Sequence, residues 1–364
     1  TGSDIMDPLV TSIFNSCWDL GCKFFYWTFD GYIQPKKDFE PLWNETKVIN
    51  SIGNKPILKS QNRTTQTQVY TFAIPVGLTI DNFIRNKAAL AQYLHEDPKN
   101  IRIELINNMA TVTIYDTNKL NFDYRSYNFD FKGVEIRIPI GIDLKTFETV
   151  YWNPTSPNEC HLLIGGSTGA GKSVCLNVIM EYLINRKDVE LWLQDTKLVD
   201  LMEYEKAPQT KVYNEGTNYS LDTIKALTSE MTSRYAYLKS KGYKNFNECP
   251  KKNKPKHIFL VIEELASFNP KEDKEFYKEL AEILAKGRAA AITVILTTQA
   301  PYADILPGVL KNNINTIIGL KTRTQEASKV ICGDYEALVN LRGKGHGKLF
   351  NGTYGEQEIQ VFNL

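Results

Sequence analysis

A glycine-rich loop between an apolar run and a helix-forming segment is the part of the chain most suited to chemistry. Residues 162–164 are apolar, and residues 166–173 have the Walker A spacing of glycines before a lysine and a serine. Glycines let the backbone turn successive N–H groups toward phosphates, and the start of the next helix adds partial positive charge. The loop predicts ATP binding, with Lys172 at the β- and γ-phosphates and Ser173 on Mg²⁺. The candidate nucleotide-binding residues are Gly166, Ser167, Thr168, Gly169, Ala170, Gly171, Lys172, Ser173 and Val174.

Two consecutive acids follow a second apolar run. Residues 258–262 are apolar, and Glu263 and Glu264 come directly after them. This is the Walker B arrangement, in which one acid supports the Mg²⁺ shell and the next polarises the attacking water. We expect Glu263 to serve the metal, in place of the usual aspartate, and Glu264 to be the catalytic base. The departure at Glu263 leaves open a nucleotide-binding module with little turnover.

Polar residues flank a third apolar run, residues 292–297. Gln299 follows its end, where an amide can sense the γ-phosphate or orient water. Arg288 precedes its start, and the planar guanidinium suits the phosphate oxygens of a transition state. A surface arginine without a catalytic role fits the same spacing. The catalytic candidates are Lys172, Glu264, Arg288 and Gln299.

From about residue 160, short apolar runs alternate with helix-forming segments. This pattern predicts an α/β fold, a RecA-like P-loop domain with a mainly parallel sheet, preceded by a small α+β domain. The expected domains are an N-terminal amphipathic helix or juxtamembrane segment (1–44), the small domain (45–132) and the motor domain (133–364). The expected strands are 68–74, 101–106, 110–115, 134–140, 161–164, 189–193, 257–262, 292–297, 315–320 and 355–362. The expected helices are 5–33, 80–94, 171–185, 220–241, 271–290, 304–313 and 325–332.

The composition is that of an ordinary soluble globular protein. Of 364 residues, 42% are hydrophobic and 23% charged, and the net charge of +1 argues neither for nor against a nucleic-acid partner. The six cysteines form no CxxC pair, which indicates a reduced intracellular protein without a zinc site. No apolar run reaches the length of about 18 residues that a membrane span needs. The first residues, 1–3, resemble the remnant of a cleaved tag, so we expect the natural protein to begin upstream.

Several further motifs occur in the order found in one family of motors. They are the strand and lead-in at 134–143, Asp-Thr-Lys at 195–197, Glu-Met-Thr-Ser-Arg-Tyr at 230–235, and the segments 285–291 and 297–301. With the loop and the paired acids, they resemble the FtsK/SpoIIIE/HerA family of ring-shaped DNA translocases over about residues 68–362. The resemblance implies an ATPase that pumps DNA as a homo-oligomeric ring, with six subunits as the expected number. It also implies that Arg288 is an arginine finger, which acts on the nucleotide of a neighbouring subunit.

The resemblance also implies where DNA would bind. Lys311 and Lys329 are similar to pore-facing DNA contacts of the family. The remaining contact positions carry Ala300 and Gln325 in place of basic residues, so we expect a weaker grip on DNA. The candidates to compensate are Lys321 and Arg323.

The chain ends at Leu364, without the winged-helix module of chromosome-segregating members. This favours similarity to conjugative coupling proteins of Gram-positive mobile elements, of the TcpA type. The implied partners are double- or single-stranded DNA, a relaxase, secretion-channel proteins and the membrane, through a segment outside this chain. We expect the full-length protein at the cytoplasmic face of the cell membrane, with this chain as a soluble part. The alternatives are a chromosome-segregation translocase of the FtsK type and a protein-secretion ATPase of the type VII kind.

Overall fold

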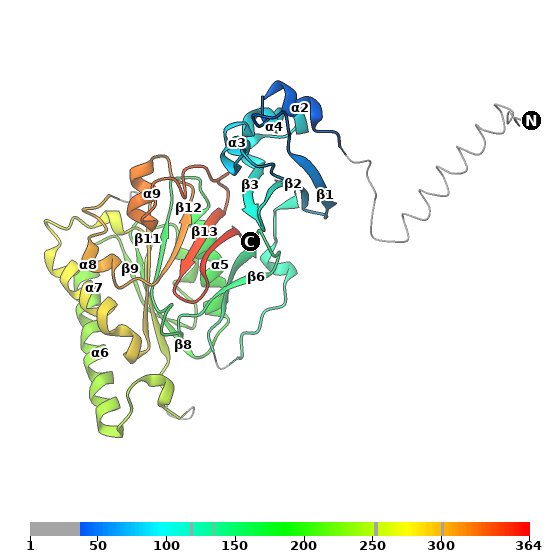
Figure 1. Cartoon of the computed structure of the whole chain (residues 1–364). Coiled ribbons are helices and arrows are strands. Elements are labelled where there is room, and N and C mark those ends of the chain that lie inside the picture. Colours follow the sequence, from blue (N-terminus) through cyan, green and yellow to red (C-terminus); the bar gives the residue numbers. More distant parts are fainter. Residues whose placement is uncertain (1–36, 117–118, 134, 251–253, 300–301) are drawn as a thin grey trace, which may run out of the picture. The chain divides into compact units, whose positions relative to one another are not determined.

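The computed structural model describes residues 37–116, 119–133, 135–250, 254–299 and 302–364 (Figure 1). The described residues form two compact units, divided between Ile114 and Tyr115, and each unit is described by itself. The helix expected over residues 5–33 lies outside the described residues. Within the described ranges, no helix has the length and apolar character needed to cross a membrane.

The smaller unit contains one four-stranded sheet with short helices packed against it. Its strands are β1 (Ile57–Arg63), β2 (Thr67–Ala73), β3 (Ile101–Ile106) and β4 (Met109–Tyr115), in the order β1-β2-β4-β3. Its helices are α2 (Glu40–Glu45), α3 (Ile80–Arg85) and α4 (Lys87–Leu94). Trp43 of α2 packs edge-on against Phe72 of β2 and Phe83 of α3, so aromatic contacts form much of this core.

Two features of the smaller unit differ from the prediction. The helix expected over residues 80–94 is broken at Asn86, whose side chain donates a hydrogen bond to the Asn82 carbonyl. Asparagine often ends helices because its side chain competes for backbone hydrogen bonds. The strand β1 was missed because it lies at the sheet edge and is largely polar.

The larger unit is built on a ten-stranded sheet. Its strands are β5 (Ile138–Asp143), β6 (Thr149–Trp152), β7 (Leu162–Gly165), β8 (Val189–Asp195), β9 (Thr210–Glu215), β10 (His257–Ile262), β11 (Ile292–Thr298), β12 (Thr316–Leu320), β13 (His346–Asn351) and β14 (Gly355–Val361). Their order is β6-β5-β14-β13-β12-β7-β11-β10-β8-β9. The strands from β12 to β9 pair in parallel, and those from β13 to β6 are antiparallel. The predicted α/β fold with a mainly parallel sheet is confirmed.

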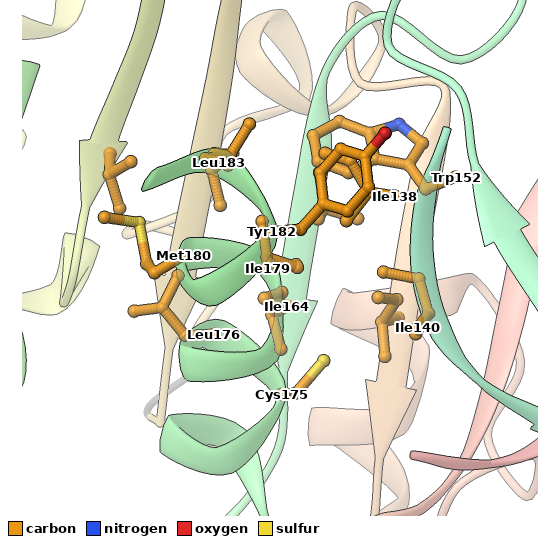
Figure 2. Close-up of a cluster of buried hydrophobic side chains, with 14 of the residues drawn as sticks. Ile138, Ile140, Trp152, Ile164, Cys175, Leu176, Ile179, Met180, Tyr182 and Leu183 are labelled. Atoms are coloured by element: carbon orange, nitrogen blue, oxygen red, sulfur yellow. The ribbon is translucent and has the colours of Figure 1, made fainter. Parts of the chain in front are cut away.

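Helices cover both faces of the parallel strands. They are α5 (Lys172–Ile184), α6 (Ser220–Lys241), α7 (Lys274–Lys286), α8 (Gly308–Lys311) and α9 (Gln325–Cys332). On one face α5 packs against the sheet, and Figure 2 shows the side chains that meet there: Ile138, Ile140, Trp152, Ile164, Cys175, Leu176, Ile179, Met180, Tyr182 and Leu183. On the other face α6 and α7 pack together over β10 and β11. Burial on both sides explains the continuous apolar runs of the sequence.

The described residues between 115 and 132, which the sequence analysis placed in the small domain, pack with the larger unit. The ring of Tyr124 lies 4.8 Å from that of Phe129 and 5.9 Å from that of Phe362, which follows β14. The backbone N–H of Tyr124 also donates to the carbonyl of Asn363. The aromatic side chains of this segment need apolar partners, and the end of the chain provides them.

Buried His161, just before β7, predicts a loss of stability in acid. Its Nδ1 accepts a hydrogen bond from the Val294 N–H at 3.0 Å, and burial lowers its pKa to about 4. The unfolded chain therefore binds the proton first, and stability falls as the pH drops from about 6.5 to 4, by about 3 kcal/mol. Urea unfolding at both pH values should show this extra loss in the wild type relative to His161→Asn, which keeps an acceptor but does not titrate. Equal losses in the two proteins would contradict it.

Candidate nucleotide site

The glycine-rich loop connects the end of β7 to the start of α5. Gly165 pairs with Thr298 of β11, and α5 begins at Lys172. Gly169 and Gly171 have φ values of +79° and +107°, in the left-handed region that glycine adopts without strain. The loop therefore has the strand, glycines and helix start that a phosphate-binding loop requires.

Backbone from later parts of the chain supports this loop. The N–H and Oγ of Ser167 both donate to the Lys321 carbonyl at 2.9 Å. The Gly345 N–H donates to the Ala170 carbonyl at 2.8 Å. The ends of the loop are thus bonded to the segment after β12 and to the turn before β13.

This close packing predicts that Gly171→Ala is far more damaging than Gly169→Ala. Both residues have positive φ, but a Cβ on Gly171 would lie 2.6 Å from the Gly345 nitrogen, whereas one on Gly169 would meet nothing within 4 Å. Both variants bear the backbone strain of about 1 kcal/mol, and only Gly171→Ala must also displace backbone. Thermal unfolding should show the larger loss for Gly171→Ala, together with at least about tenfold weaker binding of a fluorescent ATP analogue. Equal melting temperatures would contradict the steric argument.

Lys172 is buried beside the end of β10. Its Nζ donates to Thr297 Oγ1 at 3.2 Å and lies 3.8 Å from Glu263 Oε1. The Thr297 hydroxyl in turn donates to the Glu263 carbonyl. Burial lowers the pKa of Lys172, while attraction to Glu264 opposes that shift. The lysine is thus held at the mouth of the loop, where phosphates would bind.

The paired acids come together with partners from two other strands. Glu263 is fully buried, and its carboxylate accepts hydrogen bonds from Thr196 at 3.0 Å and Lys197 at 2.8 Å. Burial raises the pKa of Glu263. Both carboxylate oxygens of Glu264 accept from the Gln299 N–H at 3.1 Å. The side chain of Gln299 also bonds Thr168 of the loop at 3.1 Å.

The donor set of this site fits Mg²⁺. The Ser173 hydroxyl lies in the first turn of α5, and the Glu263 carboxylate lies near Lys172. Mg²⁺ prefers oxygen ligands and keeps several waters when it binds with nucleotide phosphates. Among the described residues, no cluster of three or more acidic, histidine or cysteine side chains could hold a metal by itself. The protein would therefore supply only part of the ion's shell.

The structure thus brings Lys172, Glu263, Glu264 and Gln299 to one edge of the sheet. Sequence reasoning assigned no role to Thr196, Lys197 or Thr297, which complete the cluster. The available signal was the Asp-Thr-Lys motif at residues 195–197, which follows a parallel strand.

Arg288 does not belong to this edge. Arg288 lies in a 3₁₀ turn before the start of β11, whereas the glycine-rich loop lies past the end of β11. The length of this seven-residue strand separates Arg288 from the loop by about 20 Å. Arg288 is exposed, donates to the Pro157 carbonyl at 3.0 Å and lines a cavity of about 310 Å³ with Lys244 and His257. This separation excludes a direct role of Arg288 at the site of its own subunit.

The four DNA-contact candidates lie around α9. Lys311 is half-buried and donates to the Lys329 and Val330 carbonyls at 3.3 and 2.6 Å, and burial lowers its pKa. Lys329 is exposed and donates to Tyr335 at 2.6 Å. Arg323 is exposed and Lys321 is half-buried. Lys311 is therefore engaged with helix carbonyls, and Lys329 and Arg323 are the more accessible of the four.

This arrangement of loop, acids and polar strand end on a mainly parallel sheet is that of a RecA-like P-loop ATPase. The strand order places β11, with Gln299 after it, between the loop strand β7 and the acid strand β10. The chain belongs to the FtsK/SpoIIIE family, whose model matches residues 112–320. The resemblance inferred from the motifs is thereby confirmed.

Individual relatives agree with this assignment. The chain is 32% identical to the DNA translocase FtsK of Staphylococcus aureus, over 51% of this chain and 25% of the relative. It is 30% identical to the DNA translocase SftA of Bacillus subtilis, over 68% of this chain and 27% of the relative. The chain thus spans about a quarter of the length of these curated relatives. Among solved structures, the fold is similar to the conjugation coupling protein TcpA of pCW3, a monomer with ATPγS, at a TM-score of 0.61 and 22% identity, covering 89% of this chain and 94% of that one.

Proposed function

We propose that this chain is the ATP-driven motor of a DNA translocase that works in conjugative transfer as a homo-oligomeric ring. The observation that carries the conjugative role is the extent of the fold likeness to the pCW3 coupling protein. That likeness covers 89% of the chain, more than the larger unit alone, so it includes part of the smaller unit. In this role the full-length protein would work at the cytoplasmic face of the cell membrane, with a relaxase and secretion-channel proteins as partners.

The geometry of the site supports a hydrolytic step. Lys172 would neutralise charge on the β- and γ-phosphates, and Mg²⁺, held by Ser173 and Glu263, would supply further charge compensation. Glu264 would accept the proton of a water whose oxygen bonds the γ-phosphorus as the bond to ADP breaks. Gln299, bonded to both Glu264 and the loop, would orient that water.

ATP hydrolysis with and without DNA tests the proposal. We expect turnover to rise with double- or single-stranded DNA, to fall with added salt because phosphate contacts are ionic, and to vanish in Glu264→Gln. An ATP hydrolysis rate that is the same with and without either form of DNA would overturn the translocase proposal and favour a protein-secretion ATPase.

The cellular role needs a separate test, because the curated relatives are DNA translocases of the FtsK and SftA types. Deletion of the gene should abolish conjugative transfer and leave chromosome segregation unchanged. Normal transfer with chromosomes trapped at division septa would instead support a chromosome-segregation translocase.

A further inference from the structure

The buried carboxylates of Glu263 and Glu264 need more positive charge nearby than the P-loop lysine, Lys172, provides. The side chains are 0% and 7% exposed and adjacent in sequence. Carboxylates buried this deeply are costly unless they are paired with cations and hydrogen-bonded. Lys172 lies 3.8 Å from Glu263, and its charge would be shared with phosphates once nucleotide binds.

Lys197 contacts both acids at once. Its Nζ lies 2.8 Å from Glu263 Oε1 and 3.3 Å from Glu264 Oε2. Burial alone would lower the pKa of Lys197, but hydrogen bonding and attraction to the two acids raise it. The geometry therefore places one ammonium group against two carboxylates that would otherwise repel each other.

The segment that carries Lys197 is itself fixed near the site. Lys197 follows β8, which pairs with the acid strand β10, and the preceding Thr196 donates to Glu263 Oε2. Farther along the segment, the Leu201 N–H donates to Asp195 Oδ2 at 3.0 Å. Lys197 thus reaches the acids from a short connection bonded at both ends.

Glu264 is held from two directions. The Gln299 N–H donates to both carboxylate oxygens, and Lys197 contacts Oε2 from the β8 side. We propose that Lys197 is a positioning residue: by bridging Glu263 and Glu264, it fixes the Glu264 carboxylate in the orientation that polarises the attacking water. The inference rests on the proposed hydrolytic function and adds to it a residue that binds neither phosphate nor water.

The test compares Lys197→Met, which removes the charge at similar length, with Lys197→Arg, which can still bridge two carboxylates. We expect Lys197→Met to lower kcat about 10²-fold, with the KM for ATP and the Kd of a fluorescent ATP analogue changed less than about threefold. Lys197→Arg should recover a large part of kcat. Lys211→Met is the matched control. Lys211 lies on the edge strand β9 and pairs with Glu190 of β8 at 3.2 Å, so this variant also loses a lysine–glutamate pair but should leave kcat unchanged.

Two outcomes would overturn the inference. An unchanged kcat would show that Glu264 needs no bridge, and a raised KM and Kd at constant kcat would make Lys197 a phosphate ligand instead.

A stability measurement separates failure of the proposed bridge from failure of the proposed function. Lys197→Met should lower the melting temperature by about 5 °C. The double variant Lys197→Met/Glu264→Gln should recover part of that loss, because it no longer buries an unpaired Glu264 carboxylate. If the losses of the two single variants simply add in the double variant, the bridge is refuted, even if the wild type does not hydrolyse ATP.

Discussion

Replacing Glu264 by glutamine is expected to abolish ATP hydrolysis while leaving ATP binding nearly intact. General base catalysis contributes about 10²–10⁴-fold to a rate, and glutamine cannot accept the proton. Glutamine has nearly the same size and can still accept the hydrogen bond from the Gln299 N–H. The kcat should therefore fall by about that factor, with the Kd of a fluorescent ATP analogue unchanged within about threefold.

The control for Glu264→Gln is Glu275→Gln. Glu275 lies on α7, is 58% exposed and pairs with Lys225 on the surface, so its loss should not affect turnover. A Glu264→Gln protein that keeps more than about a tenth of wild-type kcat would exclude Glu264 as the base.

Arg288→Ala is expected to be inactive alone and to regain activity when mixed with Glu264→Gln. Arg288 lies at the end of the sheet opposite to the loop, so a catalytic role requires that it act on the nucleotide of a neighbouring subunit in the proposed ring. Where it has been measured, an arginine finger contributes about 10³–10⁵-fold. In a mixed ring, an Arg288→Ala subunit has an intact base, and its Glu264→Gln neighbour supplies the arginine.

The mixing experiment has a clear contrary outcome. If the mixture is as inactive as each variant alone, although size-exclusion chromatography shows assembled mixed rings, Arg288 is not a finger in trans. Arg125→Ala is the matched control, because Arg125 is an exposed arginine of the same unit far in sequence from both sites. It should retain wild-type activity at every protein concentration.

The nucleotide edge of the fold was predictable because parallel strands end on the same side. The apolar runs before Gly166, Glu263 and Gln299 each indicated a buried strand, so the residues after them had to meet. The antiparallel half was less predictable: β6 and β13 were missed, as was the edge strand β9. These strands are short or partly polar, so their sequences lack the continuous apolar run that indicated the other strands.

The partners of the site residues were harder to predict. Lys197 lies about seventy residues before Glu264, and only the pairing of β8 with β10 brings them together. The Lys321 and Gly345 contacts with the loop use backbone atoms, which leave no trace in side-chain type. Positions that act through their backbone can be recognised only once the fold is known.

The contact between Gly345 and the loop has a consequence for what counts as a complete nucleotide-binding unit. Residues 112–320, the region that the family model matches, contain the loop, both acids and Gln299. A fragment with those boundaries would lack the Lys321 carbonyl, the Gly345 N–H and the strands β13 and β14, which join β12 to β5. It would keep the candidate catalytic residues of the loop, the acids and Gln299, but β12 would become an edge strand and the loop would lose two of its backbone hydrogen bonds. We therefore expect the smallest module that holds the loop in this conformation to extend to the last strand, because backbone groups beyond residue 320 support the loop.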